Sequence, residues 1–287
     1  MLLKCRDDLI ELELMKCLRG RVTFNEKEER QFRFLVLGEI GENIVNNKAA
    51  CLEGTVVQIQ DLVISQDRIC QIDLLLIGSQ KIYILDAKHW EGTYKVGPDG
   101  FMDLTHDPLH QLERAKRMVA EILRKMRVSL PVEARLVFTN PNVTLYGLTA
   151  EMPIVLPQQL DSYFQKIRMT EAAMSDWQLR LGERFVGMHV NDNRYRKLMS
   201  YDHDSVRPGI MCGECRGVMR EHSRKMLGCS NCGLTEPKLV GLKRTKKEFE
   251  RLFPNHKKPV ESLYRWCGGL VSKRSIYEHT RKNKVKN

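Results

Sequence analysis

The chain has 287 residues, 42% of them hydrophobic and 29% charged, which is the composition of an ordinary globular protein. This length allows one sizeable core and a small additional domain. No apolar run approaches the roughly 20 residues of a membrane-spanning helix, and the acidic pair Asp7-Asp8 is incompatible with a secretory signal. We therefore expect a cytoplasmic protein without a membrane segment.

The excess positive charge lies near the C-terminus. The net charge is +11; Arg207 to Asn287 contain 20 Lys and Arg against 7 Asp and Glu, whereas residues 1–206 contain 27 against 29. A short basic segment that carries all of the excess charge favours a polyanionic partner, and nucleic acid is the leading candidate. A solubilising surface is the alternative.

The first half of the chain alternates between helical and strand patterns. Apolar residues at helical spacing predict helices over 8–18 and 26–52, and alternation predicts a strand over 55–64. Two aliphatic strands follow within residues 71–90, joined by a turn at Gly78-Ser79. A short further strand is expected over 92–96.

A helix start is encoded by Asp107-Pro108, with Asp as the N-cap and Pro at the first helical position. This helix should end near Met126. Short strands are predicted over 134–139 and 154–156, and two helices within 157–183. The element order predicts an α/β protein with a mixed sheet flanked by helices.

Charged residues end the two aliphatic strands. Asp73 interrupts the first strand, and Asp86-Ala87-Lys88 closes the second. Ionised groups at the edge of a core need partners. Two carboxylates supply hard oxygen ligands for a divalent cation, and a nearby lysine can act on a metal-bound water. The alternatives are an edge charge for Asp73 and a simple Lys88–Asp86 ion pair.

The helix over 26–52 offers a third carboxylate. Glu39 and Glu42 are three residues apart and therefore lie on the same side of the helix. Either residue can complete the cluster, although glutamates on a helix are usually solvated.

These residues occur in the order of a known family. The sequence resembles the nuclease-related domain (NERD) of the PD-(D/E)xK nuclease superfamily, from about Gly38 to Thr139. The resemblance rests on Gly41-Glu42 with Ile44-Val45, Gln71-Ile72-Asp73, the segment Asp86-Ala87-Lys88-His89-Trp90-Glu91-Gly92, and Asp107-Pro108 with Gln111. Asp86 stands where many relatives have Glu.

The resemblance implies a restriction-endonuclease-like core that hydrolyses DNA phosphodiester bonds. It implies that Asp73 and Asp86 hold Mg²⁺ or Mn²⁺, that Glu42 completes the metal shell, and that Lys88 positions the attacking water. Gln111 would orient groups from the following helix. Because members of the superfamily can lose activity and keep the fold, a catalytically inactive DNA-binding or regulatory protein is the alternative.

Four of the nine cysteines have the spacing of a zinc ribbon. Cys212-Gly-Glu-Cys215 and Cys229-Ser-Asn-Cys232 are two C-x-x-C pairs separated by thirteen residues. Four thiolates suit tetrahedral Zn²⁺ and leave no open position, so the predicted zinc is structural. The other cysteines should be reduced thiols. A redox role for a C-x-x-C pair is the weaker alternative, because no thioredoxin-like context surrounds it.

Basic residues lie within and after the ribbon. We expect a basic helix over 245–253 and a helix–glycine turn–helix pattern over 263–280, which resembles a helix-turn-helix. A helical hairpin without special function is the alternative. The residues predicted to contact nucleic acid are Arg216, Arg220, Arg224, Lys225, Lys273 and Arg274.

We therefore divide the chain into four segments. They are a nuclease-like domain over 1–190, a linker over 191–210, a zinc ribbon over 211–240, and a basic helical tail over 241–287.

Overall fold

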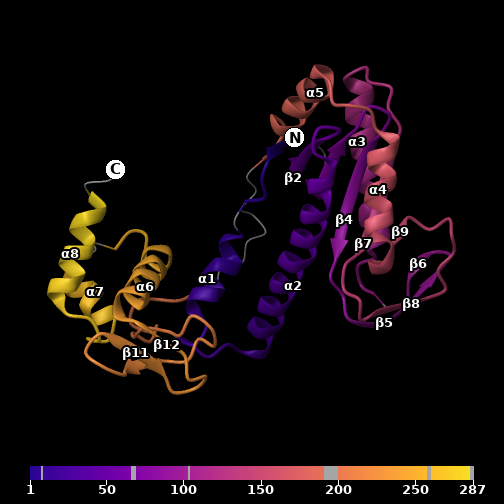
Figure 1. Cartoon of the computed structure of the whole chain (residues 1–287). Coiled ribbons are helices and arrows are strands. Elements are labelled where there is room, and N and C mark those ends of the chain that lie inside the picture. The colour runs from indigo at the N-terminus through magenta and orange to yellow at the C-terminus, as the bar shows by residue number, and fades with distance from the viewer. Residues whose placement is uncertain (8, 66–68, 103, 191–199, 257–259, 285–287) are drawn as a thin grey trace. The chain divides into compact units, whose positions relative to one another are not determined.

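The computed structural model describes the chain apart from residues 8, 66–68, 103, 191–199, 257–259 and 285–287. The chain divides into two compact units (Figure 1). The first unit comprises Met1–Asp8 and Arg33–Tyr195, and the second comprises Leu9–Phe32 and Arg196–Asn287. Within the described part of the chain, no helix has the length and apolar character needed to cross a bilayer.

The first unit is built on a six-stranded mixed sheet with the order β1-β2-β3-β4-β7-β9. The strands β2, β3 and β4 are antiparallel neighbours, while β7 runs parallel to both β4 and β9. The strand bounds are Leu2–Lys4 (β1), Val57–Ser65 (β2), Ile69–Ile77 (β3), Ile82–Lys88 (β4), Val132–Phe138 (β7) and Ile154–Val155 (β9). The predicted mixed α/β sheet is confirmed.

Helices cover both faces of this sheet. Successive side chains of a strand point to opposite faces, so strands made of consecutive apolar residues present an apolar surface on each face, and each surface packs against helices. The helices α3 and α5 cover the face that carries Leu75 and Ile77, and α2 with α4 cover the face that carries Leu74 and Leu76. The helix bounds are Glu26–Ala49 (α2), Pro108–Lys125 (α3), Leu160–Thr170 (α4) and Asp176–Val186 (α5), with 3₁₀ turns at Ala50–Leu52 and Pro157–Gln159. The first residues of α2 belong to the second unit.

A small second sheet extends the first unit beyond the end of β4. Its order is β6-β5-β8, and Trp90 anchors it with edge-to-face contacts at 5.6 Å to both Phe101 and Phe138. The strand bounds are Gly92–Gly97 (β5), Gly100–Phe101 (β6) and Val143–Tyr146 (β8).

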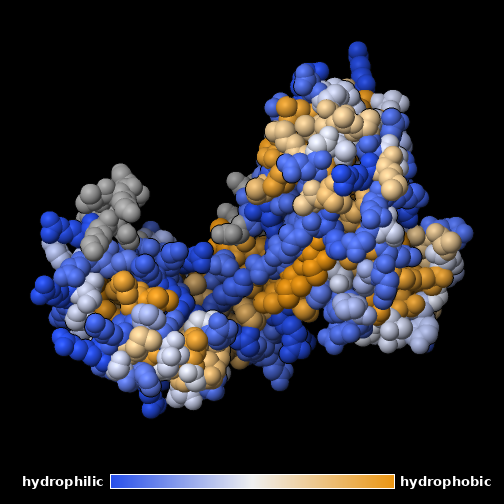
Figure 2. Space-filling view, in the orientation of Figure 1, coloured by the Kyte–Doolittle hydropathy of each residue, from blue (hydrophilic) through white to orange (hydrophobic). Residues whose placement is uncertain are grey.

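Among the described residues, the second unit combines a three-stranded antiparallel sheet with helices from both ends of the chain. Its visible surface in Figure 2 is mostly hydrophilic, with small apolar patches. The element bounds are Ile10–Leu18 (α1), Met219–Glu221 (β10), Met226–Cys229 (β11), Thr235–Pro237 (β12), Lys238–Leu252 (α6), Val260–Trp266 (α7) and Lys273–Lys284 (α8).

The boundaries of this unit differ from the predicted division. Leu18 of α1 shares one core with Val206, Ile210 and Phe249, and all four side chains are buried. Residues 9–32 therefore belong with the C-terminal segment, and the end of the predicted linker over 191–210 is part of a folded core. The ribbon is too small to form a sufficient core alone, so it recruits these segments. Residues 191–199 of that linker lie outside the described residues.

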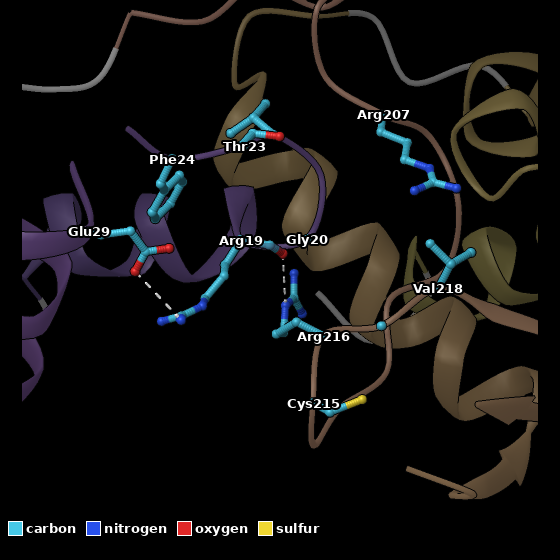
Figure 3. A pocket seen from close by; sticks show the side chains of 11 residues that line it. Arg19, Gly20, Thr23, Phe24, Glu29, Arg207, Cys215, Arg216 and Val218 are labelled. Atoms are coloured by element: carbon cyan, nitrogen blue, oxygen red, sulfur yellow. Dashed lines mark hydrogen bonds and ion pairs between the residues drawn. The ribbon is translucent and has the colours of Figure 1, made fainter. Parts of the chain in front are cut away.

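A hollow of about 410 Å³ lies between the α1–α2 loop and the first C-x-x-C pair (Figure 3). Three arginines line it, but two of them serve the fold. Arg19 lies 3.6 Å from Glu29, and its guanidinium is 4.5 Å from the ring centre of Phe32. Arg216 donates to the carbonyl oxygen of Arg19 at 3.3 Å. The third arginine, Arg207, is exposed.

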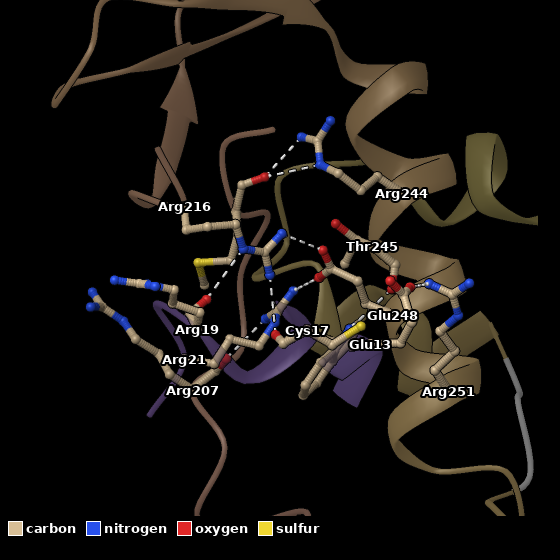
Figure 4. A network of polar contacts seen from close by, with 12 residues as sticks. Glu13, Cys17, Arg19, Arg21, Arg207, Arg216, Arg244, Thr245, Glu248 and Arg251 are labelled. Carbon is tan, nitrogen blue, oxygen red and sulfur yellow. Dashed lines mark hydrogen bonds and ion pairs between the residues drawn. The ribbon is translucent and has the colours of Figure 1, made fainter. Parts of the chain in front are cut away.

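A buried ion-pair network ties the α1–α2 loop and the ribbon to α6 (Figure 4). Glu248 of α6 accepts from both Arg21 and Arg216, each at 2.6 Å. The side chain of Arg21 is fully buried, and its guanidinium lies 4.4 Å from the ring centre of Trp266. Arg216 also donates to the carbonyl oxygen of Cys17 at 3.1 Å. One carboxylate thus holds two arginines from distant parts of the sequence.

The substitution Glu248→Ala should destabilise the second unit by about 3–5 kcal/mol, because it leaves two largely buried guanidinium groups without their carboxylate. Amide hydrogen exchange of α6 and the ribbon, measured by mass spectrometry, should accelerate while β2–β4 stay unchanged. The matched control is Glu221→Ala, which removes an exposed carboxylate that pairs with the half-buried Lys238 and should cost about 0–1 kcal/mol. Equal effects of the two substitutions would contradict this role of Glu248.

Candidate functional site

The predicted catalytic residues of β3 and β4 lie next to each other. The β3–β4 ladder pairs Leu74 with Leu85, and Asp73 and Asp86 occupy the next step of the same register. Asp73 Oδ2 accepts a hydrogen bond of 2.9 Å from the backbone N–H of Ala87. The hairpin therefore places the two carboxylates at one end of the strand pair.

Lys88 joins them from the last position of β4. It is two residues beyond Asp86, so both side chains leave the same face of the strand. Its ammonium group forms an ion pair with Asp86 Oδ1, and both side chains are largely buried. The structure thus brings together Asp73, Asp86 and Lys88, as their positions in the sequence predict.

Glu42 reaches the site from α2. A Cβ atom on Gly41 would lie 3.1 Å from the Cβ atom of His89 and 3.3 Å from Thr139 Oγ1, so the glycine lets the helix approach the ends of β4 and β7. Gly38, one turn earlier on the same helix, allows no such approach, because beyond its own helix no heavy atom of the described chain would lie within 4 Å of its Cβ.

Glu42 is held by an arginine from the N-terminal segment. Arg6 Nε lies 2.7 Å from Glu42 Oε2, and Arg6 Nη2 donates to Oε1 at 3.3 Å. The two side chains are 12% and 13% exposed, so the pair is shielded from solvent. The sequence offered no sign of this contact, because Arg6 lies 36 residues from its partner.

In β2 and β3 the alternation of side chains between the two faces of the sheet is interrupted at the site. Side chains of a regular strand alternate between faces, yet on each strand two residues three positions apart pack into the same core. These residues are Ile59 and Leu62 on β2, and Ile72 and Leu75 on β3. The sheet is therefore locally kinked next to the acidic side chains.

Asp61 lies at this kink and was missed by the sequence analysis. Its φ is +48°, a value that few residues other than glycine adopt, and the β2–β3 register places it opposite Asp73. The side chain is buried and accepts from Gln71 Nε2 at 2.8 Å. An inward-pointing acid in an otherwise alternating strand is the signal that could have identified it.

These residues form a cluster that is short of positive charge. Its members, which we call the acidic cluster, are Glu42, Asp61, Asp73 and Asp86 with the cations Arg6 and Lys88. The pKa of Glu42 is raised to about 7: burial is the largest cause, Asp61 and Asp86 add to it, and Arg6 and Lys88 oppose it. Burial, and then the charges of Asp86 and Glu42, raise the pKa of Asp73 well above its usual range. A divalent cation would relieve this repulsion.

Lys88 stays protonated in this setting. Burial alone would lower the pKa of its ammonium group, but Asp86 and Asp73 outweigh burial and raise it. Lys88 is therefore a fixed positive charge within the acidic cluster.

Gln111 lies in α3, which begins as predicted. Asp107 is the N-cap and accepts from the N–H of Leu109 at 2.8 Å, with Pro108 at the first helical position. The Gln111 side chain is exposed. No hydrogen bond connects it to the acidic side chains in the described part of the chain. Arg114, one turn further along, acts electrostatically on Cys70 together with Asp86 and Asp73, so α3 presents a cation to this region.

The four cysteines of the ribbon converge. All four Sγ atoms lie within 4.8 Å of one another, with Cys212 and Cys232 3.6 Å apart and Cys215 and Cys229 3.5 Å apart. Tetrahedral Zn²⁺ with Zn–S bonds near 2.3 Å requires sulfur separations of about 3.8 Å. The cluster can therefore hold structural zinc. Among the described residues it is the one such group; the carboxylates of the acidic cluster are not gathered as tightly.

One thiol of the ribbon ionises easily. Hydrogen bonds from the Asn231 side chain and the Gly217 N–H lower the pKa of Cys215 to about 6. A thiolate is the form that binds zinc.

The residues predicted to contact nucleic acid divide into two groups. Arg220, Arg224 and Lys225 are exposed. The others have partners within the unit: Arg216 binds Glu248, Lys273 pairs with Glu261, and Arg274 pairs with Glu278. The helix–glycine turn–helix pattern forms as α7 and α8, with positive φ at Gly268 and Gly269.

A mixed sheet covered by helices on both faces carries Asp73, Asp86 and Lys88 at the end of a hairpin, with Glu42 beside them. Residues 37–139 match the family model of the nuclease-related domain, NERD, which is the family that the sequence resembles. The match contains every residue of the acidic cluster except Arg6. No curated protein and no solved structure matches the chain.

Replacing Arg6 should move the titration of Glu42. In Arg6→Met, the pKa of Glu42 should rise above its value of about 7, because the guanidinium that favours the charged form is lost. Carbon NMR of glutamate carboxyl groups in the metal-free protein measures this shift, and the Glu42 signal is assigned by its absence in Glu42→Gln. Arg117→Met, which affects an exposed pair with Glu113, should leave Glu42 unchanged. An unmoved Glu42 in Arg6→Met would contradict the pairing.

Zinc removal should unfold the ribbon and leave the first unit folded. Binding to four thiolates contributes about 10–16 kcal/mol in small zinc domains, so chelation or Cys212→Ser should abolish the dispersed NMR signals of β10–β12. The signals of β2–β4 should persist. Cys51→Ser, at an exposed free thiol, should keep one zinc per chain. A ribbon that stays folded without metal would refute a structural zinc.

Proposed function

We propose that the first unit is a metal-dependent nuclease that hydrolyses phosphodiester bonds of DNA, and that the second unit binds the nucleic acid. The observation that carries this proposal is the meeting of Asp73, Asp86 and Lys88 within a nuclease-related domain. Glu42 and Asp61 add carboxylates to the same place.

The donor set fits Mg²⁺ or Mn²⁺. These ions prefer carboxylate oxygens, and burial together with the neighbouring acids raises the pKa values of Glu42 and Asp73. We assign Asp73 and Asp86 as the metal-binding residues, with Glu42 and Asp61 next to them. When bound, the metal would neutralise the scissile phosphate and favour ionisation of a water molecule.

Lys88 acts as a cation in this proposal. Because Asp86 and Asp73 raise the pKa of its ammonium group, we assign it the role of a cation and not that of a general base. Its ammonium group instead positions the attacking water and stabilises the negative charge that develops on the phosphate oxygens. We assign Gln111 a positioning role from α3, on the resemblance to the family, and Arg6 the role of keeping Glu42 ionised.

The second candidate function is a DNA-binding or regulatory protein without catalysis. It is favoured by the pairing of Glu42 with Arg6 and of Asp86 with Lys88, since these contacts neutralise two carboxylates of the acidic cluster without a metal.

Plasmid nicking separates the two functions. The purified full-length chain should convert supercoiled plasmid to nicked circles with Mg²⁺ or Mn²⁺, and Lys88→Ala and Asp73→Asn should each reduce the rate by about 100-fold or more. The control Lys81→Ala alters a lysine at the other end of β4, where it pairs with Glu133, and should cut normally. If the chain binds plasmid but does not cleave it with Mg²⁺ or with Mn²⁺, the non-catalytic alternative is established.

A further inference from the structure

A second, basic groove lies entirely within the second unit. It has a volume of about 700 Å³ and runs between the β10–β11 turn, the start of α6 and the first turns of α8. Arg224 and Lys225 form one side, Ser272 and Ser275 form the other, and Leu239 contributes apolar surface. Pockets of roughly 300–1,000 Å³ enclose small ligands, so the groove has room for individual bases.

Two cations of the groove are available to a ligand. Arg224 and Lys225 are exposed, and among the described residues neither side chain has an ion-pair or hydrogen-bond partner. The acid of the groove, Glu278, already pairs with Arg274 at 2.9 Å, and Lys238 pairs with Glu221 at 3.0 Å. The groove therefore carries an uncompensated positive charge from Arg224 and Lys225.

The walls of the groove are fixed before any ligand binds. The N–H of Lys238 donates to the carbonyl oxygen of Lys225 at 2.9 Å, which ties the β10–β11 turn to the start of α6. Ser272 Oγ accepts from the N–H of Ser275 at 3.2 Å and caps α8, and Ile276 anchors this helix in the core. A preformed site loses little conformational entropy on binding.

The apolar surface decides which polyanion fits. Leu239 is 49% exposed, and Pro237 and Val271 line the groove beside it, with the ring of His279. A duplex shields its bases in a stack and presents mainly phosphates, whereas an unpaired strand presents both phosphates and base faces. The exposed cations of the basic groove suit the phosphates of an unpaired strand, and its apolar surface suits the faces of the bases.

The charge of the whole unit supports a nucleic-acid ligand. The second unit contains 27 Lys and Arg against 14 Asp and Glu, whereas the first unit contains 20 against 22. Two basic side chains at the start of α8 are less available, because Lys273 and Arg274 pair with Glu261 and Glu278. The β10–β11 turn is thus better placed than the start of α8 to contact phosphates.

We propose that this groove binds one unpaired strand of nucleic acid, with Arg224 and Lys225 on consecutive phosphates and bases packed against Leu239. This inference rests on the proposed function and deepens it, because it names the form of nucleic acid that the second unit holds. It would direct the nuclease to substrates that contain a single-stranded segment.

Fluorescence anisotropy with the full-length chain tests the groove. The protein carries Lys88→Ala to prevent cleavage, and the probes are labelled oligothymidylate, oligouridylate and a blunt duplex of the same length. A single strand should bind more tightly than the duplex. The double substitution Arg224→Ala with Lys225→Ala should weaken single-strand binding at least tenfold and reduce the slope of log Kd against log salt by about 1.4, since each phosphate contact contributes about 0.7.

Two further variants distinguish binding in the groove from non-specific attraction by the positive charge of the unit. The pair Lys243→Ala and Lys247→Ala removes the same charge from exposed positions of α6 that do not line the groove, and it should weaken binding less than twofold. Leu239→Ser should weaken single-strand binding and leave duplex binding unchanged. Zinc content of one per chain verifies that each variant is folded.

Stronger binding of the duplex, or equal losses in the groove and control pairs, would overturn the proposal. Cleavage measured with Lys88 intact keeps the two claims apart. If nicking is normal but the groove substitutions do not weaken binding, the groove proposal fails alone. If the groove binds single strands but no metal supports nicking, the nuclease proposal fails alone.

Discussion

The concentration of carboxylates at the end of the β3–β4 hairpin is the constraint on which the first unit depends. Four acids share a largely buried space with two cations. Like charges that cannot all be solvated raise one another's pKa values, so the metal-free cluster is a poor arrangement for stability alone. A bound cation would offset the free-energy cost of placing these carboxylates together. The surrounding sheet, covered by helices on both faces, provides the rigidity that holds such an arrangement together.

The second unit has an excess of positive charge, and its cations fall into two groups. Arg21 and Arg216 are turned inward to Glu248, where they link α1, the ribbon and α6. Arg224 and Lys225 are exposed and line the basic groove. Burial thus distinguishes the cations that stabilise the fold from those that are available for a polyanion. Sequence position does not distinguish them, because Arg216 and Arg224 lie in the same interval between the two C-x-x-C pairs.

Local chemistry explains which features the sequence could predict. The aliphatic runs define β3 and β4, Asp107-Pro108 defines the start of α3, and the spacing of Cys212, Cys215, Cys229 and Cys232 defines the ribbon. These signals need no knowledge of distant residues. Other features depend on contacts between residues far apart in the sequence. They are the placement of residues 9–32 in the second unit, the Arg6–Glu42 pair and the burial of Arg216 against Glu248. No pattern within a short window encodes them.

Asp61 shows how backbone and charge combine at the site. A non-glycine residue with φ of +48° inside a strand is strained, and glycine would adopt this conformation without the steric cost of a Cβ atom. Backbone geometry alone therefore does not account for an aspartate at this position. The carboxylate does account for it, because it lies opposite Asp73 and contributes to the field on Glu42. Strained residues of this kind are concentrated at functional sites. The kink in β2 and β3 thus coincides with a fourth acid, which acts electrostatically on Glu42.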